Sequence, residues 1–423
     1  MLSVEKNDRL TRVGPGTPMG NLMRRYWHPT LLSSELKESD GPPVRVRLLG
    51  EDLIAFRDTN GKVGLIDAYC SHRRAPMFYG RNEECGLRCV YHGWKFDVNG
   101  NCTEIPAMPG NTSILSKAKL LAYPVVEKAG IIWSYMGPAE LEPPPPDYEW
   151  MRAPKTHRFV SKNYQASSYL QALEGGLDTS HSSFLHNNVL GNNNTVRNAD
   201  PTPSIDVFET DYGYQYVAIR NIGEMRRYVR VYNYILPFQQ MRGDAADDSG
   251  TRSKVPKIDG HFWVPIDDEQ TMVWSWMYGI DESAEITEEF ASRDEKRAGR
   301  GEDDFLPGTF KLKKNPSNDH LIDRALQKSS SFTGITGVGT QDMAVQECME
   351  PIVDRSKEML IWTDKAIMSM RKILLENTYC VERGEAPAGV LPQTHSHLRA
   401  FDAVIASDAD WREAFKDLLK PKW

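Results

Sequence analysis

The sequence contains few cysteines and no long apolar run. Six cysteines occur among 423 residues: Cys70, Cys85, Cys89, Cys102, Cys348 and Cys380. They are too few and too scattered for a disulfide framework. No apolar stretch approaches the roughly 20 residues of a membrane span, and residues 1–10 lack the apolar core of a signal peptide. We therefore expect a reduced, cytoplasmic location and no membrane partner.

An excess of positive charge and a nucleotide-binding loop are also missing. The formal net charge is −7, which argues against nucleic acid as the main partner. Residues 334–339 read G-x₂-G-x-G rather than the G-x-G-x-x-G of a dinucleotide-binding loop. The four-cysteine pattern of a plant-type ferredoxin is absent as well. Chemistry that uses NADH or a flavin would therefore depend on a partner protein.

The most informative motif consists of Cys70 and His72, followed by Cys89 and His92. In a Rieske [2Fe–2S] cluster two cysteines hold one iron and two histidines hold the other, and here each loop offers one ligand of each type. Two cysteines and two histidines also suit structural zinc, but zinc modules usually pair Cys with Cys and His with His. Cys85 could compete with Cys89, although only Cys89 stands three residues before a histidine. The motif predicts a Rieske cluster.

The remaining pattern predicts an α+β protein. Short alternating stretches and the turn dipeptide Asn60-Gly61 predict a small antiparallel β domain over residues 40–150, the Rieske domain. Residues 151–423 predict a larger catalytic domain, with an antiparallel sheet flanked by helices. Residues 1–39 are expected to pack on that catalytic domain. We further expect one strand over 127–135 and helices over 164–173, 283–300, 357–377 and 402–419.

A second constellation is Asp178-x₂-His181-x₄-His186. Two histidines and one carboxylate form the facial triad of non-haem Fe(II) sites that activate oxygen, and a Rieske cluster needs such an electron acceptor. Five residues turn an ideal α-helix through roughly 500°, so the two histidines can converge only if the helix is bent or bulged. Asp178 and His181 share a helix face. An N-cap role is the structural alternative for Asp178.

The third iron ligand must be a carboxylate from elsewhere in the chain. Asp342 follows a glycine-rich turn that could bring its backbone close. Glu347, Glu350 and Asp354 are rivals, and spacing alone does not choose among them.

The chain resembles the Rieske non-haem iron oxygenases, specifically phthalate dioxygenase-like oxygenase components. The resemblance rests on GPGTPMGNLMRRYW near the N-terminus, on the cluster loops with Gly93-Trp94, on QALEGGLDTSH and on QDMAVQECMEPIVDR. It covers nearly the whole chain and implies a helix-grip, START-like catalytic domain. It also implies that His181, His186 and Asp342 bind the mononuclear iron, with Asp342 matching the family's ligand after glutamine.

The resemblance further implies a role for Asp178 and a set of partners. In a head-to-tail trimer, Asp178 would bridge His181 to His92 of the neighbouring subunit. The expected assembly is therefore a homotrimer or a hexamer built of trimers. Electrons would come from an NADH-dependent flavin or iron–sulfur reductase, directly or through a ferredoxin, and O₂ would be the oxidant.

For the substrate, the resemblance favours an aromatic carboxylic acid, and carboxylates are typically bound by arginine. Arg226 and Arg230 share one strand face, and Arg220 lies nearby; Arg227 and Arg242 are further candidates. A solvated strand face is the alternative for any one of them. The expected outcome is ring cis-dihydroxylation or O-demethylation of a methoxylated or biaryl aromatic acid. The alternative from another class is an electron carrier without catalytic activity or a zinc-ribbon binding module, which would leave some 270 residues unexplained.

Overall fold

The computed structural model describes residues 2–110, 112–187, 195–197 and 200–423, which form two compact units. The smaller unit consists of residues 13–16 and 23–145. The larger consists of the chain up to Arg12, residues 17–22 and residues 146–423. The expected N-terminal segment 1–39 is therefore divided between the units, because its strand β1 (Trp27–Leu32) pairs with β10 (Ile131–Tyr135) of the smaller unit.

The smaller unit is built from three antiparallel sheets. Their strand orders are β1-β10-β9, β2-β3-β4 and β5-β6-β7-β8. The remaining strands are β2 (Val44–Leu48), β3 (Glu51–Arg57), β4 (Val63–Asp67), β5 (Arg81–Glu83), β6 (Gly86–Arg88), β7 (Lys95–Phe96), β8 (Cys102–Glu104) and β9 (Val125–Lys128), and helix α3 spans Thr112–Leu115. The small antiparallel β domain predicted from the sequence is confirmed.

Tight turns fix the registers of these sheets. The predicted turn between β3 and β4 is confirmed, because Gly61 has a φ of +78° and Oδ1 of Asp58 accepts from the backbone N–H groups of Asn60 and Lys62. The single strand expected over 127–135 is wrong. Ala129 and Gly130 both adopt positive φ and reverse the chain, so this stretch forms the β9–β10 hairpin.

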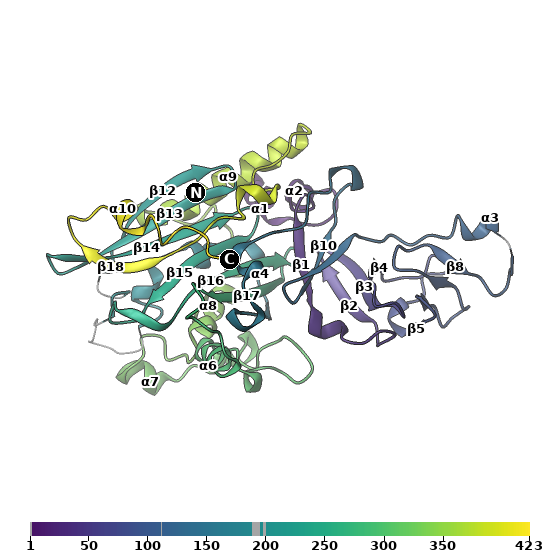
Figure 1. Cartoon of the computed structure of the whole chain (residues 1–423), viewed down its shortest axis with the longest axis horizontal. Coiled ribbons are helices and arrows are strands. Elements are labelled where there is room, and N and C mark those ends of the chain that lie inside the picture. Colours follow the sequence, from purple (N-terminus) through teal and green to yellow (C-terminus); the bar gives the residue numbers. More distant parts are fainter. Residues whose placement is uncertain (1, 111, 188–194, 198–199) are drawn as a thin grey trace. The chain divides into compact units, whose positions relative to one another are not determined.

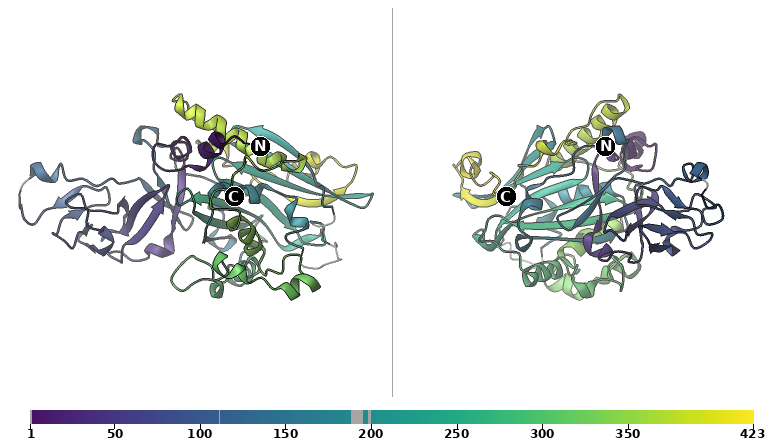
Figure 2. Two further views of the ribbon diagram at one scale, coloured as in Figure 1. Left: turned by 180° about the vertical axis from the view of Figure 1, so that it is seen from behind. Right: turned by 45° about the vertical axis from the view of Figure 1, so that its right-hand side comes forward.

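The larger unit is organised around an antiparallel sheet, whose strands lie side by side in Figures 1 and 2. Within the described residues, its order is β11-β17-β16-β15-β14-β13-β12, and an eighth strand, β18, pairs with β14. The strands are β11 (Arg158–Gln165), β12 (Ser204–Thr210), β13 (Gly213–Ile222), β14 (Arg226–Ile235), β15 (Gln239–Ala246), β16 (Arg252–Pro265), β17 (Thr271–Gly279) and β18 (Asp402–Ala406).

Helices α5 (Tyr169–Leu177) and α9 (Lys365–Glu382) contact each other and pack against the sheet, α5 on β15 and β16, α9 on β12 and β13. Helix α8 (Val338–Glu347) packs on α5, and α6 (Glu288–Ala298) packs on α8. The others are α1 (Val4–Thr11), α2 (Pro18–Met23), α4 (Glu149–Arg152), α7 (Arg324–Ser329) and α10 (Trp411–Phe415). A sheet flanked by helices is the predicted architecture. No described helix is both long and apolar enough to cross a membrane.

The four predicted helices differ from the structure in their bounds. Those expected over 283–300 and 357–377 are α6 and α9, and the other two are strands over part of their length. Residues 158–165 form β11, whose full length pairs with β17, so the helix begins only at Tyr169. That helix continues through Gly175 and Gly176, where a Cβ would lie 2.0 Å from Nε2 of Gln346 and 2.1 Å from the ring of Trp263, respectively. These glycines therefore permit close packing and do not end the helix. Residues 402–406 form β18, and only α10 within 402–419 is helical.

Candidate functional site

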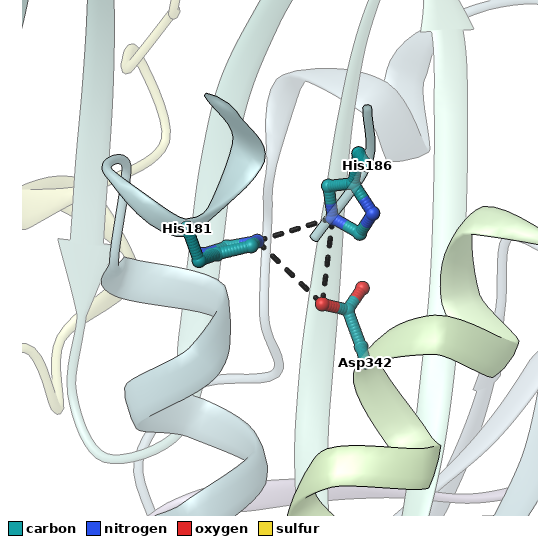
Figure 3. A group of neighbouring side chains, drawn as sticks. All are labelled: His181, His186 and Asp342. Atoms are coloured by element: carbon teal, nitrogen blue, oxygen red, sulfur yellow. Dashed lines mark hydrogen bonds and ion pairs between the residues drawn. The ribbon is translucent and has the colours of Figure 1, made fainter. Parts of the chain in front are cut away.

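His181, His186 and Asp342 point toward one another in the larger unit (Figure 3). The Nε2 atoms of the two histidines are 3.1 Å apart, and Oδ1 of Asp342 lies 3.5 Å from His181 Nε2 and 3.4 Å from His186 Nε2. Within the described residues this is the one group of three or more His, Cys, Asp or Glu side chains that could hold a metal ion. Two imidazole nitrogens and one carboxylate oxygen suit non-haem Fe(II).

The two histidines converge because the chain leaves the α-helix before reaching them. Helix α5 ends at Leu177, Asp178 is its C-cap, and His181 opens a short 3₁₀ turn. The backbone N–H groups of Phe184 and Leu185 donate to the carbonyl of His181 at 3.0 and 2.7 Å, which folds the chain back. The expected bent or bulged helix is therefore replaced by a helix end followed by a tight turn.

The third side chain of the group comes from α8. Of the four carboxylates considered from the sequence, Asp342 is the one within reach of the histidines. Glu347 on the same helix has a buried side chain that faces His320, whose Nε2 lies 3.4 Å from its Oε2. Glu350 is exposed, and Asp354 accepts from the backbone N–H of Ser356. Spacing alone could not choose Asp342 because this approach depends on the packing of α8 against α5.

The acidic and basic side chains at the triad stabilise one another's charged forms. Burial alone would raise the pKa of Asp342, but His186, His181 and Arg242 outweigh it and hold the pKa below its usual value. Burial alone would lower the pKa of His181, but Asp178 and Asp342 raise it. Nδ1 of His181 lies 3.4 Å from Oδ2 of Asp178. Asp178 therefore braces His181 from the side opposite Asp342.

The triad lies in the wall of a cavity of about 440 Å³. Arg220 and Arg230 also line it, and so does Arg242. Arg226, the third predicted substrate residue, is exposed at the start of β14 and is not among the lining residues. Arg227 donates to the carbonyl of Ala409. The sequence did not single out the lining residues His261 and Trp263, because nothing in its pattern shows which strand positions face a cavity.

The predicted cluster ligands lie on two loops of the smaller unit with matching backbone geometry. In the first, the N–H of Cys70 donates to the carbonyl of Ala75, and the N–H of Arg74 donates back to Cys70. In the second, the N–H of Cys89 donates to Trp94, and the N–H of Gly93 donates back to Cys89. Arg74 and Gly93 each adopt positive φ, at 58° and 76°. Both loops are therefore compact turns that begin with a cysteine.

The side chains of these loops fit the donor set of a Rieske cluster. Cys70 and Cys89 are buried, at 1 and 2 % exposure, whereas His72 and His92 are exposed and their rings lie 4.5 Å apart. Burial raises the pKa of the Cys70 thiol to about 11, and the nearby Cys89 adds to the shift. Binding of iron would remove that proton, because a coordinating thiol is deprotonated. Cys85 is exposed at the β5–β6 turn, where Nδ2 of Asn60 donates to its sulfur.

Comparison with known proteins agrees with the description of both units. Residues 26–124 match the family model of the Rieske [2Fe–2S] domain, and residues 134–419 match that of the LigXa C-terminal domain. NdmA from Pseudomonas putida CBB5, solved with caffeine, superposes with a TM-score of 0.63 at 20% identity, over 93% of this chain and 99% of that one. This likeness shows that the fold is shared.

Three relatives align over nearly the whole chain. The phthalate 4,5-dioxygenase oxygenase subunit of Pseudomonas putida is 37% identical, over 98% of this chain and 94% of its own length. The 3-chlorobenzoate-3,4-dioxygenase oxygenase subunit of Comamonas testosteroni is also 37% identical, over 99% of both chains. The 5,5'-dehydrodivanillate O-demethylase oxygenase subunit of Sphingobium sp. strain NBRC 103272 / SYK-6 is 33% identical, over 92% and 84%. The chain therefore belongs to the Rieske non-haem iron oxygenases, as an oxygenase subunit with a [2Fe–2S] cluster and a mononuclear iron.

Proposed function

We propose that this subunit oxidises an aromatic carboxylic acid at the cavity beside His181, His186 and Asp342. These three residues would hold the mononuclear iron, and Cys70, His72, Cys89 and His92 would hold the Rieske cluster. When bound, the iron activates dioxygen and the cluster supplies electrons. His181, His186 and Asp342 all line the cavity, where the reactants would bind.

The observation that carries the proposal is the unusual environment of Arg220. Every other arginine of the cavity wall lies within 4.0 Å of a carboxylate. These pairs are Arg197–Asp244, Arg230–Asp244, Arg242–Asp259, Arg297–Asp294 and Arg300–Glu295. Arg220 is 2 % exposed, and no carboxylate among the described residues lies within ion-pairing distance of it. A carboxylate ligand would supply the missing partner.

The remaining contacts of Arg220 hold its side chain close to the triad. Its Nη2 donates to the carbonyl of Thr179 and, at 3.3 Å, to Oγ of Ser182, two residues that flank His181. Its buried Nε has no hydrogen-bond partner among the described residues. Burial lowers the pKa of its guanidinium, although the group stays charged. Arg220 would therefore anchor a carboxylate close to the metal ligands.

The rest of the cavity suits an aromatic ring. Trp263, Val273 and Met277 contribute apolar wall, which excludes water and offers a flat surface to a ring. The volume of about 440 Å³ lies within the usual range for small-molecule sites. We expect cis-dihydroxylation or O-demethylation, because the relatives include both dioxygenases and an O-demethylase.

Electrons would come from an NADH-dependent flavin or iron–sulfur reductase, directly or through a ferredoxin. Two features support an intersubunit route in a homotrimer or a hexamer of trimers. His92 is exposed, and Asp178 lines the cavity beside His181. Asp178 would then accept from His181 of its own chain and from the partner subunit's His92.

The direct test is a product screen with the purified full-length protein, a reductase and NADH. The substrates are benzoates, phthalates, phenoxybenzoates and methoxylated biaryl acids, each paired with its methyl ester. We expect a cis-diol, or a phenol with formaldehyde, from at least one acid and much less from its ester. A His181→Ala protein with an unchanged Rieske spectrum is the control and should give no product. Turnover of the esters without preference for the acids would contradict the proposal.

A further inference from the structure

Gln341 connects His186 to a loop outside the metal-binding triad. It lies directly before Asp342 on α8 and is 1 % exposed. Its Oε1 is 2.8 Å from Nδ1 of His186. Its Nε2 donates to the carbonyl of Ile335 at 2.9 Å and to Oγ1 of Thr333 at 3.2 Å. Both ends of the amide are therefore engaged.

These contacts determine which nitrogen of His186 carries the proton. A backbone carbonyl only accepts, so the amide nitrogen of Gln341 must face Ile335. The amide oxygen then faces His186, and because that oxygen also only accepts, Nδ1 of His186 must be the donor. A neutral imidazole protonated at Nδ1 has its lone pair on Nε2. That atom is the one directed at His181 Nε2 and Asp342 Oδ1.

The backbone beside His186 is held by the same loop. The N–H of Phe332 donates to the carbonyl of Asn187 at 2.9 Å. Residues 332–335 therefore hold the histidine segment twice, once through its backbone and once through Gln341. Since Gln341 adjoins Asp342, one turn of α8 presents the carboxylate and braces the histidine that faces it.

The two histidines are braced by groups of different charge. His181 faces the carboxylate of Asp178, whereas His186 faces a neutral amide. A carboxylate favours the protonated imidazolium, but an amide oxygen only orients the neutral ring. We propose that Gln341 is a positioning residue that holds His186 in the Nδ1–H tautomer, with Nε2 free to bind metal. This inference rests on the proposed function, since it takes His186 as a metal ligand.

The test uses full-length protein that keeps its Rieske cluster but has been stripped of mononuclear metal. Co(II) binding is measured by equilibrium dialysis with elemental analysis, and the tautomer of His186 is read from its ¹⁵N chemical shifts. We expect the wild-type protein to show the Nδ1–H form. Gln341→Leu should mix the tautomers and weaken Co(II) binding roughly 10- to 100-fold.

Two further variants separate positioning from a purely structural role. Gln341→Glu keeps an oxygen that accepts from Nδ1 but loses the donors to Ile335 and Thr333, so it should bind Co(II) within a few-fold of wild type. Gln346→Leu removes another buried glutamine of α8, whose Oε1 accepts from Gln165 at 2.8 Å. It should lower the melting temperature about as much as Gln341→Leu without weakening Co(II) binding.

The outcomes distinguish the inference from the proposed metal site. If His186→Ala binds Co(II) as tightly as wild type, the assignment of the metal site is wrong. If His186→Ala loses Co(II) while Gln341→Leu keeps it, the site stands and the role of Gln341 is wrong. An Nε2–H tautomer in the wild-type protein would overturn the inference even if the variants do not fold.

Discussion

Nδ1 of His181 lies 3.4 Å from Oδ2 of Asp178, three residues earlier in the chain. The other carboxylate oxygen of Asp178 accepts from the N–H of Ser180 at 2.7 Å. Burial alone would raise the pKa of Asp178, but His181 and the backbone of residues 180 and 181 outweigh it and hold the pKa below its usual value. Asp178 is therefore an ionised, two-sided acceptor at the end of α5.

Asp178→Asn should retain both metals and slow transfer of electrons from the cluster to the iron site roughly 100-fold. An asparagine has a single acceptor oxygen, so it cannot serve both Ser180 and His181 and has none left for the partner subunit's His92. Iron analysis checks the metals, and stopped-flow absorbance follows cluster reoxidation. Asp354→Asn, in a turn where the carboxylate accepts from the N–H of Ser356, is the control. Normal reoxidation in Asp178→Asn would exclude the bridging role.

Arg220→Met should raise KM for an acid substrate roughly 10- to 100-fold, the usual value of a hydrogen bond to a charged group. It should also abolish the preference for the acid over its methyl ester, because the ester has no charge to lose. Steady-state kinetics on both compounds test this, with iron content measured in parallel. Arg226→Met is the matched control and should behave as wild type, since Arg226 lies outside the cavity wall. An unchanged KM in Arg220→Met would show that Arg220 does not anchor the substrate carboxylate.

Cys89→Ser should abolish the visible spectrum of the cluster together with its two irons and two labile sulfides, whereas Cys85→Ser should leave them intact. Cys89 is buried beside Cys70, and Cys85 is exposed on the neighbouring β5–β6 turn. Iron and sulfide analysis of the two variants checks the assignment. Loss of the cluster in both variants would show that exposure does not distinguish a cluster ligand from the other cysteine.

Glu347 should make the protein less stable as pH rises. Burial raises its pKa from 4.5 to about 7. The folded state therefore keeps a proton that the unfolded chain loses, and stability falls from about pH 4.5 to about pH 7. The shift corresponds to roughly 3 kcal/mol. Glu347→Gln removes this ionisation yet keeps an oxygen for the N–H of Ala166, which lies 2.8 Å from Oε1.

We expect Glu347→Gln to resemble wild type near pH 4.5 and to unfold at a clearly higher denaturant concentration at pH 8. Urea unfolding at several pH values measures the difference. Glu350→Gln, at an exposed neighbouring position, is the control and should leave the pH dependence unchanged. A constant difference between Glu347→Gln and wild type across the range would contradict the buried, protonated state.

The parts of the site that could be predicted are those encoded within a few residues. The Cys–His loops and the Asp178-x₂-His181-x₄-His186 motif are local, and each forms a turn whose ligands are close in sequence. Asp342 is distant in sequence, and the packing of α8 against α5 brings it to the histidines. The spacing of residues along the chain does not reveal that contact. Strand alternation put Arg226 and Arg230 on one face, but it could not show that the cavity includes Arg230 and not Arg226, which is exposed at the start of β14.

Gly176→Ala should destabilise the protein by a few kcal/mol and reduce substrate affinity. A Cβ at Gly176 would meet the ring of Trp263 at 2.1 Å, and both residues line the cavity. A rigid, buried indole cannot move aside cheaply, which outweighs the gain of about 1 kcal/mol from better helix propensity. Gly175→Ala is the matched control on the same helix. Its Cβ would meet Nε2 of Gln346, the end of a flexible side chain. The fall in melting temperature should therefore be smaller for Gly175→Ala, and equal falls would show that contact with Trp263 does not decide the residue at position 176.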